Sequence, residues 1–356
     1  MRNLFGAAIC FLLFGDAATA AATIRARVVQ YNAEWLYLNY YSPANCPGTG
    51  CSWHNMTVAA NHMDHVTTAV SSAMNREKPA DVTIINLCEI ESSYELATVA
   101  NAIGGGGGAA LTPYFVQGTD TATGQNVGLL SNIAPLRAPY RVDVKLPYPV
   151  PDSTCPTPAT GAPATGTEGV SKHAVTEFAI GGIKIAFIAA HLLAIPTDPV
   201  RCVQREAQAA VLQEYVIYPY ISAGYEILLV GDLNDYDAKI VDANNNQPVS
   251  SVLDILKGIR GKYATKYDLY GVTGLMKRKD RYTNWWDSDS NCATSSPTDY
   301  AAIDHILVTE GLYDVAENVS IWHGYSEYCG KLDSDHYPMV VDFVVGTAGA
   351  AADGNA

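Results

Sequence analysis

The sequence predicts an α/β fold organised as one large domain, and three observations indicate it. Short apolar runs of strand length recur along the 356 residues. Segments with helical spacing of apolar residues lie between them, and no internal repeat interrupts this alternation. Strands that alternate with helices over this length are typical of a single α/β unit rather than of two domains.

The predicted elements follow in chain order from the apolar pattern. Residues 26–31 form the first strand, and a helix follows because four apolar residues recur at helical spacing before Pro79 ends it. Those four are Met63, Val66, Val70 and Met74. Residues 201–218 have the composition and spacing of a long amphipathic helix. The other apolar runs of strand length are residues 82–87, 127–130, 183–189, 227–230, 303–308 and 339–344.

The N-terminal residues 1–20 have the layout of a secretory signal peptide, with Arg2, an apolar stretch and Ala18-Thr19-Ala20. This stretch is too short to span a membrane, and no other segment reaches the length of a transmembrane helix. We therefore expect a secreted, extracellular protein without a stable membrane span, whose mature chain starts near Ala21. Sequons at Asn55 and Asn318 fit a glycoprotein if the host glycosylates.

The expected domain covers residues 21–346 and contains low-complexity segments. The Pro/Thr/Ala/Gly insert at 147–169 and the glycine run at 104–108 are expected to be loops, and residues 347–356 a disordered tail. Seven of the eight cysteines follow the signal segment, which suggests three disulfide bonds and one free thiol. Cys88 is the expected buried thiol, since it lies in an apolar run. Cys46 with Cys51 is the only pairing that we predict.

The formal net charge of −14 argues against a protein that coats nucleic acid or membranes by bulk electrostatics. The cations are unevenly placed, however, because residues 257–281 carry eight Lys and Arg against two Asp. Tyrosines and the pair Trp285-Trp286 lie within or just after this segment, as in a nucleic-acid groove with rings that stack on bases. A solvated basic loop is the alternative. For a lipid-acting enzyme, only Trp285-Trp286 could enter the bilayer interface.

Polar residues stand where the apolar runs would reach solvent, and they suggest a catalytic site. In Ser334-Asp335-His336 a carboxylate beside an imidazole can bind a cation and move a proton. Glu89 ends a buried strand and is a natural ligand for a hard cation such as Mg²⁺. Asn32 ends another strand, and its amide could orient Glu89 or contact a phosphate oxygen. Its neighbour Glu34 is expected on the surface.

Three further strand ends complete the predicted site. Asp232 and Asn234 follow Gly231, which permits a sharp turn, and can point to one side to hold a water or a phosphoryl oxygen. His191 could contact a phosphate or protonate a leaving oxygen. Asp304 is a carboxylate inside an apolar strand, where burial is costly without a partner, and His336 is the expected partner.

Other histidines are expected to have no part in this site. His305, next to Asp304, is predicted to face the opposite side of the strand. His54, His62 and His65 lie among Asn and Thr, and we expect them on the polar surface of a helix rather than around zinc.

These polar clusters, in this order, resemble the endonuclease/exonuclease/phosphatase superfamily, which includes deoxyribonuclease I. The residues that carry the resemblance are Asn32, Glu89, His191, Asp232, Asn234, Asp304, Asp335 and His336. The resemblance implies a four-layer α/β sandwich of two packed mixed β-sheets flanked by helices, with the site at one sheet edge. It also implies a Mg²⁺-dependent phosphodiester hydrolase, with Mn²⁺ or Ca²⁺ as alternative cations.

The resemblance also implies a role for each residue. Glu89 and Asp335 would hold the metal together with Asn32, while His336 and Asp304 would activate water. His191, Asp232 and Asn234 would complete the catalytic set, by positioning the water and the phosphate.

The segment Gln125-Asn126 precedes a run that resembles the central strand of the family, and Asn126, like Asn32, is expected to contact substrate. Some nucleases of the group have a tyrosine shortly before this strand, and this chain has none. The 5-phosphatases of the superfamily usually carry Asp-Arg where this chain has Asp304-His305.

The leading functional hypothesis is an exported deoxyribonuclease I-like nuclease that acts on nucleic acid, with DNA favoured, as a monomer. A sphingomyelinase-type phospholipase C, acting on a sphingolipid at membrane surfaces, is the alternative enzyme. A catalytically inactive binding module on the same fold is the alternative from a different class.

Overall fold

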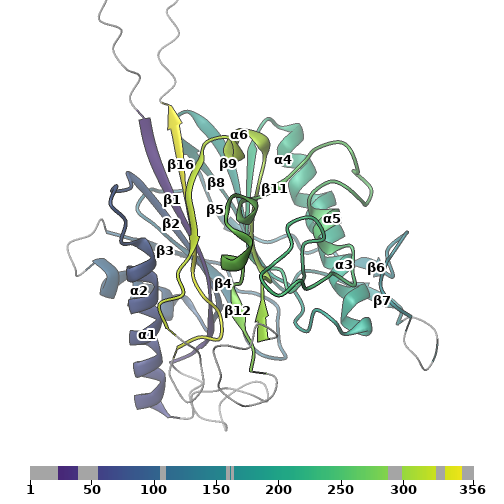
Figure 1. Cartoon of the computed structure of the whole chain (residues 1–356), viewed down its shortest axis with the longest axis horizontal. Coiled ribbons are helices and arrows are strands. Elements are labelled where there is room, and N and C mark those ends of the chain that lie inside the picture. The colour runs from purple at the N-terminus through teal and green to yellow at the C-terminus, as the bar shows by residue number, and fades with distance from the viewer. Residues whose placement is uncertain are drawn as a thin grey trace, which may run out of the picture.

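The computed structural model describes residues 23–38, 55–104, 110–157, 161, 164–287, 299–325 and 333–346. Two six-stranded mixed sheets form its centre (Figure 1). The first sheet has the order β15-β16-β1-β2-β4-β3, with β1 Thr23–Leu36, β2 Val82–Ile90, β3 Thr112–Phe115, β4 Asn126–Ser131, β15 Ala316–Ile321 and β16 Met339–Gly346. The second has the order β11-β14-β10-β9-β8-β5, with β5 Arg137–Tyr140, β8 Lys172–Ile180, β9 Ile183–His191, β10 Glu226–Asp232, β11 Tyr270–Gly271 and β14 Asp304–Val308.

Helices cover the outer face of each sheet, as Figure 1 shows for α1 and α2 on one side and α3 to α5 on the other. Two short ribbons pair β6 Leu146–Tyr148 with β7 Gly166–Glu168 and β12 Asn284–Trp285 with β13 Tyr300–Ala301. The helices are α1 Met56–Met74, α2 Ser93–Gly104, α3 Pro199–Leu212, α4 Tyr218–Ser222, α5 Val252–Leu256 and α6 Glu310–Tyr313. A π-helical segment η1 (Gln213–Ile217) joins α3 to α4, and η2 (Val272–Leu275) and η3 (Arg278–Asp280) are 3₁₀ turns.

Three apolar clusters separate these layers and explain why the central strands are apolar on both faces. Successive residues of a strand point to opposite faces. Ile84 therefore packs between the sheets, whereas Ile85 packs under α1 and α2. In β9, Phe187 likewise faces the other sheet, and Ile188 packs toward α3. Helix, sheet, sheet and helix layers follow one another, so the predicted four-layer sandwich is confirmed.

The long predicted strands and both predicted helices are present, while strands with many polar residues were missed. β8 carries Lys172, His173, Thr176 and Glu177, which break the apolar pattern although the strand pairs with β9 over its whole length. The helix expected at 201–218 is the continuous run α3–η1–α4.

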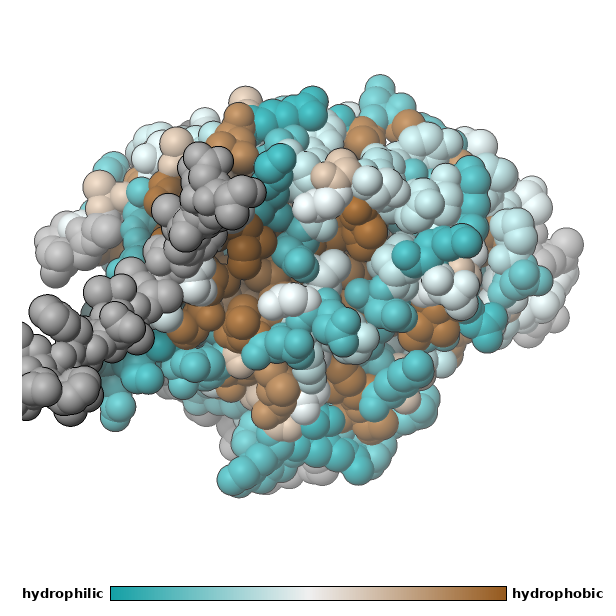
Figure 2. All heavy atoms as spheres, turned by 90° about the horizontal axis from the view of Figure 1, so that it is seen from above, coloured by the Kyte–Doolittle hydropathy of each residue, from teal (hydrophilic) through white to brown (hydrophobic). Residues whose placement is uncertain are grey.

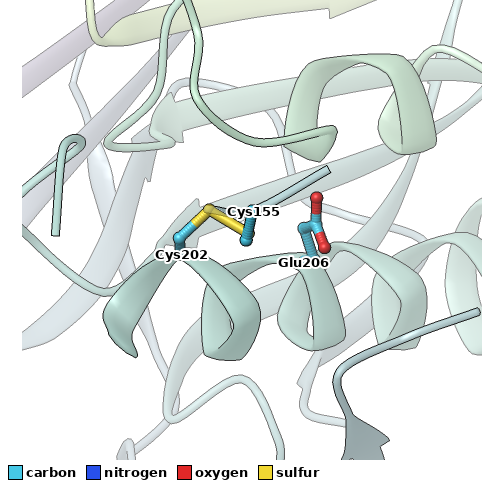
Figure 3. Close-up of side chains that lie close together, drawn as sticks. All are labelled: Cys155, Cys202 and Glu206. Atoms are coloured by element: carbon cyan, nitrogen blue, oxygen red, sulfur yellow. A yellow bond between two sulfur atoms is a disulfide. The ribbon is translucent and has the colours of Figure 1, made fainter. Parts of the chain in front are cut away.

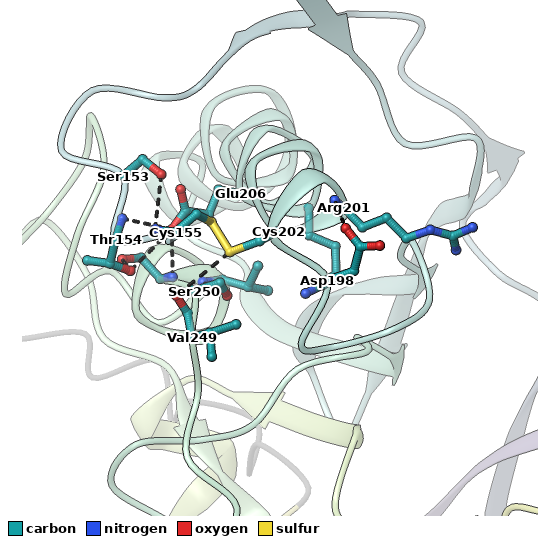
Figure 4. The surroundings of a disulfide bond; sticks show 12 residues. Ser153, Thr154, Cys155, Asp198, Arg201, Cys202, Glu206, Val249 and Ser250 are labelled. Atoms are coloured by element: carbon teal, nitrogen blue, oxygen red, sulfur yellow. Dashed lines mark hydrogen bonds between the residues drawn. A yellow bond between two sulfur atoms is a disulfide. The ribbon is translucent and has the colours of Figure 1, made fainter. Parts of the chain in front are cut away.

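The insert at 147–169 was expected to be a loop, and the structure corrects this at both ends, where β6 pairs with β7. Its Cys155 forms a disulfide with Cys202 of α3, a pairing that the sequence did not predict. Glu206 lies beside this bond (Figure 3) and accepts from the backbone N–H of Ser251 at 2.7 Å. The bond and these contacts hold the insert against α3 (Figure 4).

Cys88 is free and buried, as predicted. The predicted Cys46–Cys51 pairing, the signal segment, residues 105–108 of the glycine run and the tail 347–356 lie outside the described residues. Within the described part of the chain, no helix has the length and apolar character needed to cross a membrane.

The end of the sandwich where β1 begins and β16 ends is the one seen in Figure 2. Hydrophobic residues on this face form separate areas between hydrophilic ones. β1 begins at the face seen in Figure 2 and reaches Asn32 near its other end. The polar strand ends therefore lie at the opposite end of the sandwich.

Candidate active site

Both sheets deliver polar side chains to the same end of the sandwich. In the second sheet, Asp232 at the end of β10 lies in register with His191 at the end of β9 and with Asp304 at the start of β14. In the first sheet, Asn32 of β1 is paired with Cys88, the residue before Glu89. The sheets pack face to face, so these strand ends meet.

Glu89 is held in one orientation by three donors. Its Oε1 accepts from Asn32 Nδ2 at 3.2 Å, and its Oε2 accepts from Gln125 Nε2 at 2.6 Å and from the Trp35 backbone N–H at 3.1 Å. Its backbone φ is +60°, a region that residues other than glycine seldom adopt and that is found at functional sites. The sequence did not indicate Gln125, although it stands next to the expected Asn126.

Asp304 and His336 form the predicted dyad. Asp304 Oδ2 lies 2.6 Å from His336 Nδ1, and both side chains are buried. The carboxylate therefore fixes the proton of the imidazole on Nδ1 and leaves Nε2 toward the site. Nε2 lies 3.8 Å from Asp232 Oδ2 and 3.8 Å from Asp335 Oδ1.

A chain of buried amides supports this dyad from the core between the sheets. Gln30 Nε2 donates to the second oxygen of Asp304 at 3.0 Å, and Asn86 Nδ2 donates to Gln30 Oε1 at 2.5 Å. The donation from Asn86 fixes the orientation of the Gln30 amide, so its NH₂ group must face Asp304. Gln30 and Asn86 were missed because each lies inside an apolar strand run, where the sequence gives no sign of a partner.

The turn after β10 depends on a glycine that no other residue could replace without a backbone shift. Gly231 has a φ of +152°, and a Cβ there would lie 1.7 Å from the Ala190 carbonyl oxygen. The turn brings the Asn234 backbone N–H to Asp232 Oδ1 at 2.9 Å, and Asn234 Nδ2 donates to the Leu192 carbonyl at 3.2 Å. Asp232 Oδ2 also accepts from Asn32 Nδ2 at 3.0 Å.

Burial and mutual repulsion shift the pKa values of the acids in this site. Burial and the charges of Asp304 and Glu89 raise the pKa of Asp232 to about 7. Burial and the charge of Glu89 likewise raise the pKa of Asp335 to about 6, although His336 opposes this. Carboxylates crowded in this way disfavour full ionisation unless positive charge is brought among them.

The two histidines are shifted in opposite directions. Burial alone would lower the pKa of His336, but Asp304, Asp335 and Asp232 outweigh it and raise this pKa well above the usual value. Burial, with repulsion from Lys172 and His336, lowers the pKa of His191 well below its usual value. His191 is therefore neutral, and its Nε2 lies 3.7 Å from Asp232 Oδ2 and 3.9 Å from Glu89 Oε1.

A cavity of about 550 Å³ opens onto these groups. Its lining includes Glu89, Asp232, Asp335, His191 and His336 together with Asn234, Asn284, Trp286 and Tyr300. A larger cavity of about 610 Å³ lies between the insert, α3 and residues 259–264. None of the strand-end residues lines that second cavity, so we assign the chemistry to the smaller one.

The donor set of the smaller cavity fits a hard divalent cation. Glu89, Asp232 and Asp335 bring carboxylate oxygens to this cavity. The ligand atoms of Asp232, Asp304 and His336 lie within 4.8 Å of one another, but Asp304 does not line the cavity and its two oxygens contact His336 and Gln30. Oxygen-rich, anionic sites suit Mg²⁺ or Mn²⁺. The other such cluster, Cys155, Cys202 and Glu206, is no cation site, since its two sulfurs form the disulfide.

Asn32 is placed as a donor rather than as a metal ligand. Its Oδ1 accepts from the Glu34 backbone N–H at 3.1 Å, which fixes the orientation of the amide, and its NH₂ group faces Glu89 and Asp232. Glu34 was expected on the surface but is buried, and its Oε2 accepts from the Asp335 backbone N–H at 3.2 Å.

Asn126 is not brought into the site. Its Nδ2 donates to the backbone carbonyls of Glu91 and Gly124, and its Oδ1 accepts from the Gly118 N–H at 2.7 Å. These bonds occupy the amide, and Asn126 is not among the residues that line the cavity.

The histidines that were expected to have no part in the site differ in their surroundings. His305 faces away from the dyad, as predicted, and its Nε2 lies 2.8 Å from the Asp235 carbonyl oxygen. His62 is buried, with Nε2 2.7 Å from the Ala33 carbonyl, so its expected surface position was wrong. His65 pairs with Asp333 at 2.7 Å, and His54 lies outside the described residues.

The basic segment at 257–281 is mostly engaged in internal contacts. Lys257 is buried against Asp237, and Arg281 donates to the carbonyls of Met276 and Gly274. Tyr263 stacks on Tyr218, with ring centroids 3.8 Å apart. The face of Tyr263 that lies against Tyr218 is therefore closed to a base.

The tryptophan pair after that segment does not act as a unit. Trp285 is fully buried, so it cannot enter a bilayer as the lipid alternative required. Trp286 is 58% exposed and lines the cavity. Trp285 is the last residue of the short strand β12, and Trp286 follows the strand.

No family model matches the chain, and no curated protein matches it. Solved structures with a similar fold include a 3′-5′ exonuclease from Neisseria meningitidis, with 13% identity over 89% of this chain and 99% of that one and a TM-score of 0.49. They also include an endonuclease/exonuclease/phosphatase family protein from Bacteroides thetaiotaomicron, with 16% identity over 92% of this chain and 97% of that one and a TM-score of 0.47. A D. rerio TDP2 humanized by 14 mutations has 11% identity over 90% and 98% of the chains and a TM-score of 0.48.

Proposed function

We propose that the chain is a divalent-metal-dependent phosphodiester hydrolase. One observation carries the proposal: the Asp304–His336 dyad directs Nε2, which lies 3.5 Å from Asn32 Nδ2, into a cavity that also holds Glu89, Asp232 and Asp335. A histidine oriented by a buried carboxylate moves protons, and clustered carboxylates hold a cation that can neutralise a phosphate.

Each side chain has a distinct part in the proposed hydrolysis. His336 Nε2 would take a proton from the attacking water once a cation among the carboxylates offsets the negative charges that keep the imidazole protonated, while Asp304 holds the tautomer and stabilises the imidazolium that forms. Asp232, itself fixed by Asn32 and the Asn234 N–H, orients the water. Neutral His191 donates a hydrogen bond to a phosphoryl or leaving oxygen. Glu89 and Asp335 would hold the cation, which supplies positive charge against the phosphate.

Nucleic acid, with DNA favoured, is the first candidate substrate. The support that remains is the exposed Lys277, just before η3, and the exposed Lys279 within it, beside the Asp242–Asn246 turn. Asn246 of that turn lines the cavity. A sphingomyelinase-type reaction on a sphingolipid is the second candidate, and the exposed Trp286 and Ile195 at the cavity favour it.

We also propose that the protein is exported and acts as a monomer. The signal-like layout of residues 1–20 supports export, and the Cys155–Cys202 disulfide is consistent with an oxidising compartment. Glycosylation at Asn55 and Asn318 belongs to the same proposal, because Asn55 is exposed at the start of α1 and Asn318 is exposed in β15.

The test is a hydrolysis assay on one purified preparation, with DNA, RNA, sphingomyelin and inositol phosphates as substrates. Each reaction is run with Mg²⁺, with Mn²⁺ and with EDTA, and His336→Ala is the matched control for contaminating enzymes. We expect cleavage of at least one phosphodiester that EDTA and His336→Ala both abolish. Cleavage that survives EDTA, or that His336→Ala retains in full, would refute the proposal.

A further inference from the structure

The catalytic cavity has an unusual electrostatic character for a site that accepts phosphates. Four carboxylates line it, and among the described residues no lysine or arginine does. The four are Glu89, Asp232, Asp299 and Asp335. A bound cation can neutralise one phosphate, but a second phosphate on the same substrate would face the remaining acidic wall.

The nearest buried cations are already engaged with protein groups. Lys172 lies behind Gln125, 3.3 Å from its Oε1, and pairs with Asp120 at 3.6 Å. Arg205 is fully buried and pairs with Asp235 at 3.4 Å. Neither side chain lines the cavity, so neither is placed to receive a flanking phosphate.

The rim of the cavity is instead apolar and aromatic. Trp286 and Ile195 are among the few large hydrophobic side chains that are exposed, at 58% and 49%, and both line this cavity. Tyr236 and Tyr300 line it as well. Exposed apolar side chains gathered at a cavity mark a surface that buries part of a ligand.

The position of Ile195 is maintained at a cost in backbone strain. Its φ is +68°, in the left-handed region that is a genuine outlier for a β-branched residue. Arg205 holds the conformation from behind, because Nη1 donates to the carbonyls of Leu193 and Ile195 at 3.1 and 3.0 Å and Nη2 to that of Pro196 at 2.8 Å. Backbone strain that is held in place by the surrounding structure is found most often at functional sites.

We propose, on the basis of the proposed function, that this cavity selects phosphodiesters whose scissile phosphate is flanked by an apolar or planar group and by no second negative charge. Trp286 and Ile195 form the walls that bury that group. The acidic lining disfavours any further phosphate. The same chemistry could be offered by a dinucleoside monophosphate or by a zwitterionic phospholipid.

The test compares three esters that share one reaction, in which a water oxygen forms a bond to phosphorus and the bond to p-nitrophenolate breaks. They are methyl p-nitrophenyl phosphate, thymidine 5′-(p-nitrophenyl phosphate) and the 3′-phosphorylated form of the latter. We expect kcat/KM to be highest for the thymidine ester, and the added 3′-phosphate to lower it roughly tenfold at low salt. An equal or higher kcat/KM for the 3′-phosphorylated ester would overturn the charge selection.

A charge variant at the rim tests the cause of that selection. Thr197 is exposed and lines the cavity, so Thr197→Lys places a cation there, whereas Val200→Lys adds the same charge to an exposed site outside the lining. Thr197→Lys is expected to recover most of the loss on the 3′-phosphorylated ester. An equal effect of Val200→Lys would attribute the selection to net charge and contradict the proposal.

The apolar walls are tested by Trp286→Ala and Ile195→Gly. We expect each to lower kcat/KM for the thymidine ester roughly tenfold more than for the methyl ester, because the two esters share the p-nitrophenyl group and differ only in the group on the other side of the phosphorus. Glycine accepts a positive φ, so Ile195→Gly should not lower thermal stability, which separates a role in selection from a role in folding. Equal losses on both esters would contradict the wall assignment.

Binding distinguishes failure of this inference from failure of the proposed function. If no ester is hydrolysed with Mg²⁺ or Mn²⁺, the hydrolase assignment fails. The inference still requires that the three esters bind with the same ranking of affinity. Binding is measured by tryptophan fluorescence, with Trp286→Phe as the control. Zwitterionic and anionic phospholipid vesicles, compared with dinucleoside monophosphates, then separate the two sources of the ligand, and preference for the anionic vesicles would overturn the selection.

Discussion

Replacing Asp304 with asparagine conserves the shape of the side chain and removes the second acceptor oxygen. In the parent, one oxygen accepts the Nδ1–H of His336 at 2.6 Å and the other accepts from Gln30 Nε2 at 3.0 Å. Asparagine has only one oxygen. Its NH₂ group must therefore face either the NH₂ group of Gln30 or His336 Nδ1, and the second arrangement moves the imidazole proton to Nε2.

The expected loss follows from the bond that is removed. A hydrogen bond to a charged group contributes about 1.5–3 kcal/mol, and each 1.4 kcal/mol is a factor of ten in rate. We therefore expect kcat for methyl p-nitrophenyl phosphate to fall roughly 10- to 100-fold, with KM little changed. Thermal unfolding of the variant checks that the fold remains, and Asp254→Asn, at a partly exposed carboxylate paired with Arg260, is the matched control.

Coupling between the two residues gives the result that would refute the dyad. Because Asp304 acts through His336, the double variant with His336→Ala should be about as slow as His336→Ala alone. Additive losses in kcat, or an Asp304→Asn variant with parental kcat, would show that the carboxylate does not act through this imidazole.

Three further predictions concern the groups around the dyad. Gln30→Met leaves one oxygen of Asp304 buried without its donor, so kcat should fall roughly fivefold or more with KM unchanged, and unchanged kcat would exclude a positioning role. Gly231→Ala should destabilise the protein by roughly 3 kcal/mol or more in urea unfolding, whereas Gly224→Ala, at a φ of +78° with nothing within 4 Å, should cost about 1 kcal/mol. The raised pKa of Asp232, about 7, means that the folded state binds the proton more tightly, so this residue contributes stability that is present near pH 4 and lost as the pH rises to about 7. Without metal, the parent should therefore lose unfolding free energy relative to Asp232→Asn as the pH rises from about 4 to about 7. A difference that does not change with pH would contradict the raised pKa.

The main strands and the residues at their ends were predictable because apolar runs define both. Once the apolar strand runs are placed, Glu89, His191 and Asp232 fall where β2, β9 and β10 end, and parallel or paired strand ends must meet. The polar strand β8 could not be recognised in the same way. Its Lys172 and His173 are buried by tertiary contacts with the loops before it, which no local pattern reveals.

Contacts between side chains that are far apart in the chain could also not be predicted from the sequence. The basic segment suggested free charge, but Lys257 is paired with Asp237 in the interior, and a local excess of cations does not show which are paired. Gln30, inside β1, was read as part of an apolar strand and is the residue that supports Asp304. Trp285 is buried and the next residue, Trp286, is exposed just after a strand of only two residues, too short for a sequence pattern to show.

The central claim, hydrolysis that depends on a cation held by Glu89, is tested most directly by a metal titration. EDTA-treated protein is mixed with methyl p-nitrophenyl phosphate, Mg²⁺ is added back stepwise, and the parent is compared with Glu89→Gln. Glutamine keeps the shape and removes the charge that three donors orient. We predict a saturable return of activity in the parent and a requirement for roughly 10- to 100-fold more Mg²⁺, or no return, in the variant. Identical titration curves for the two proteins would contradict the account.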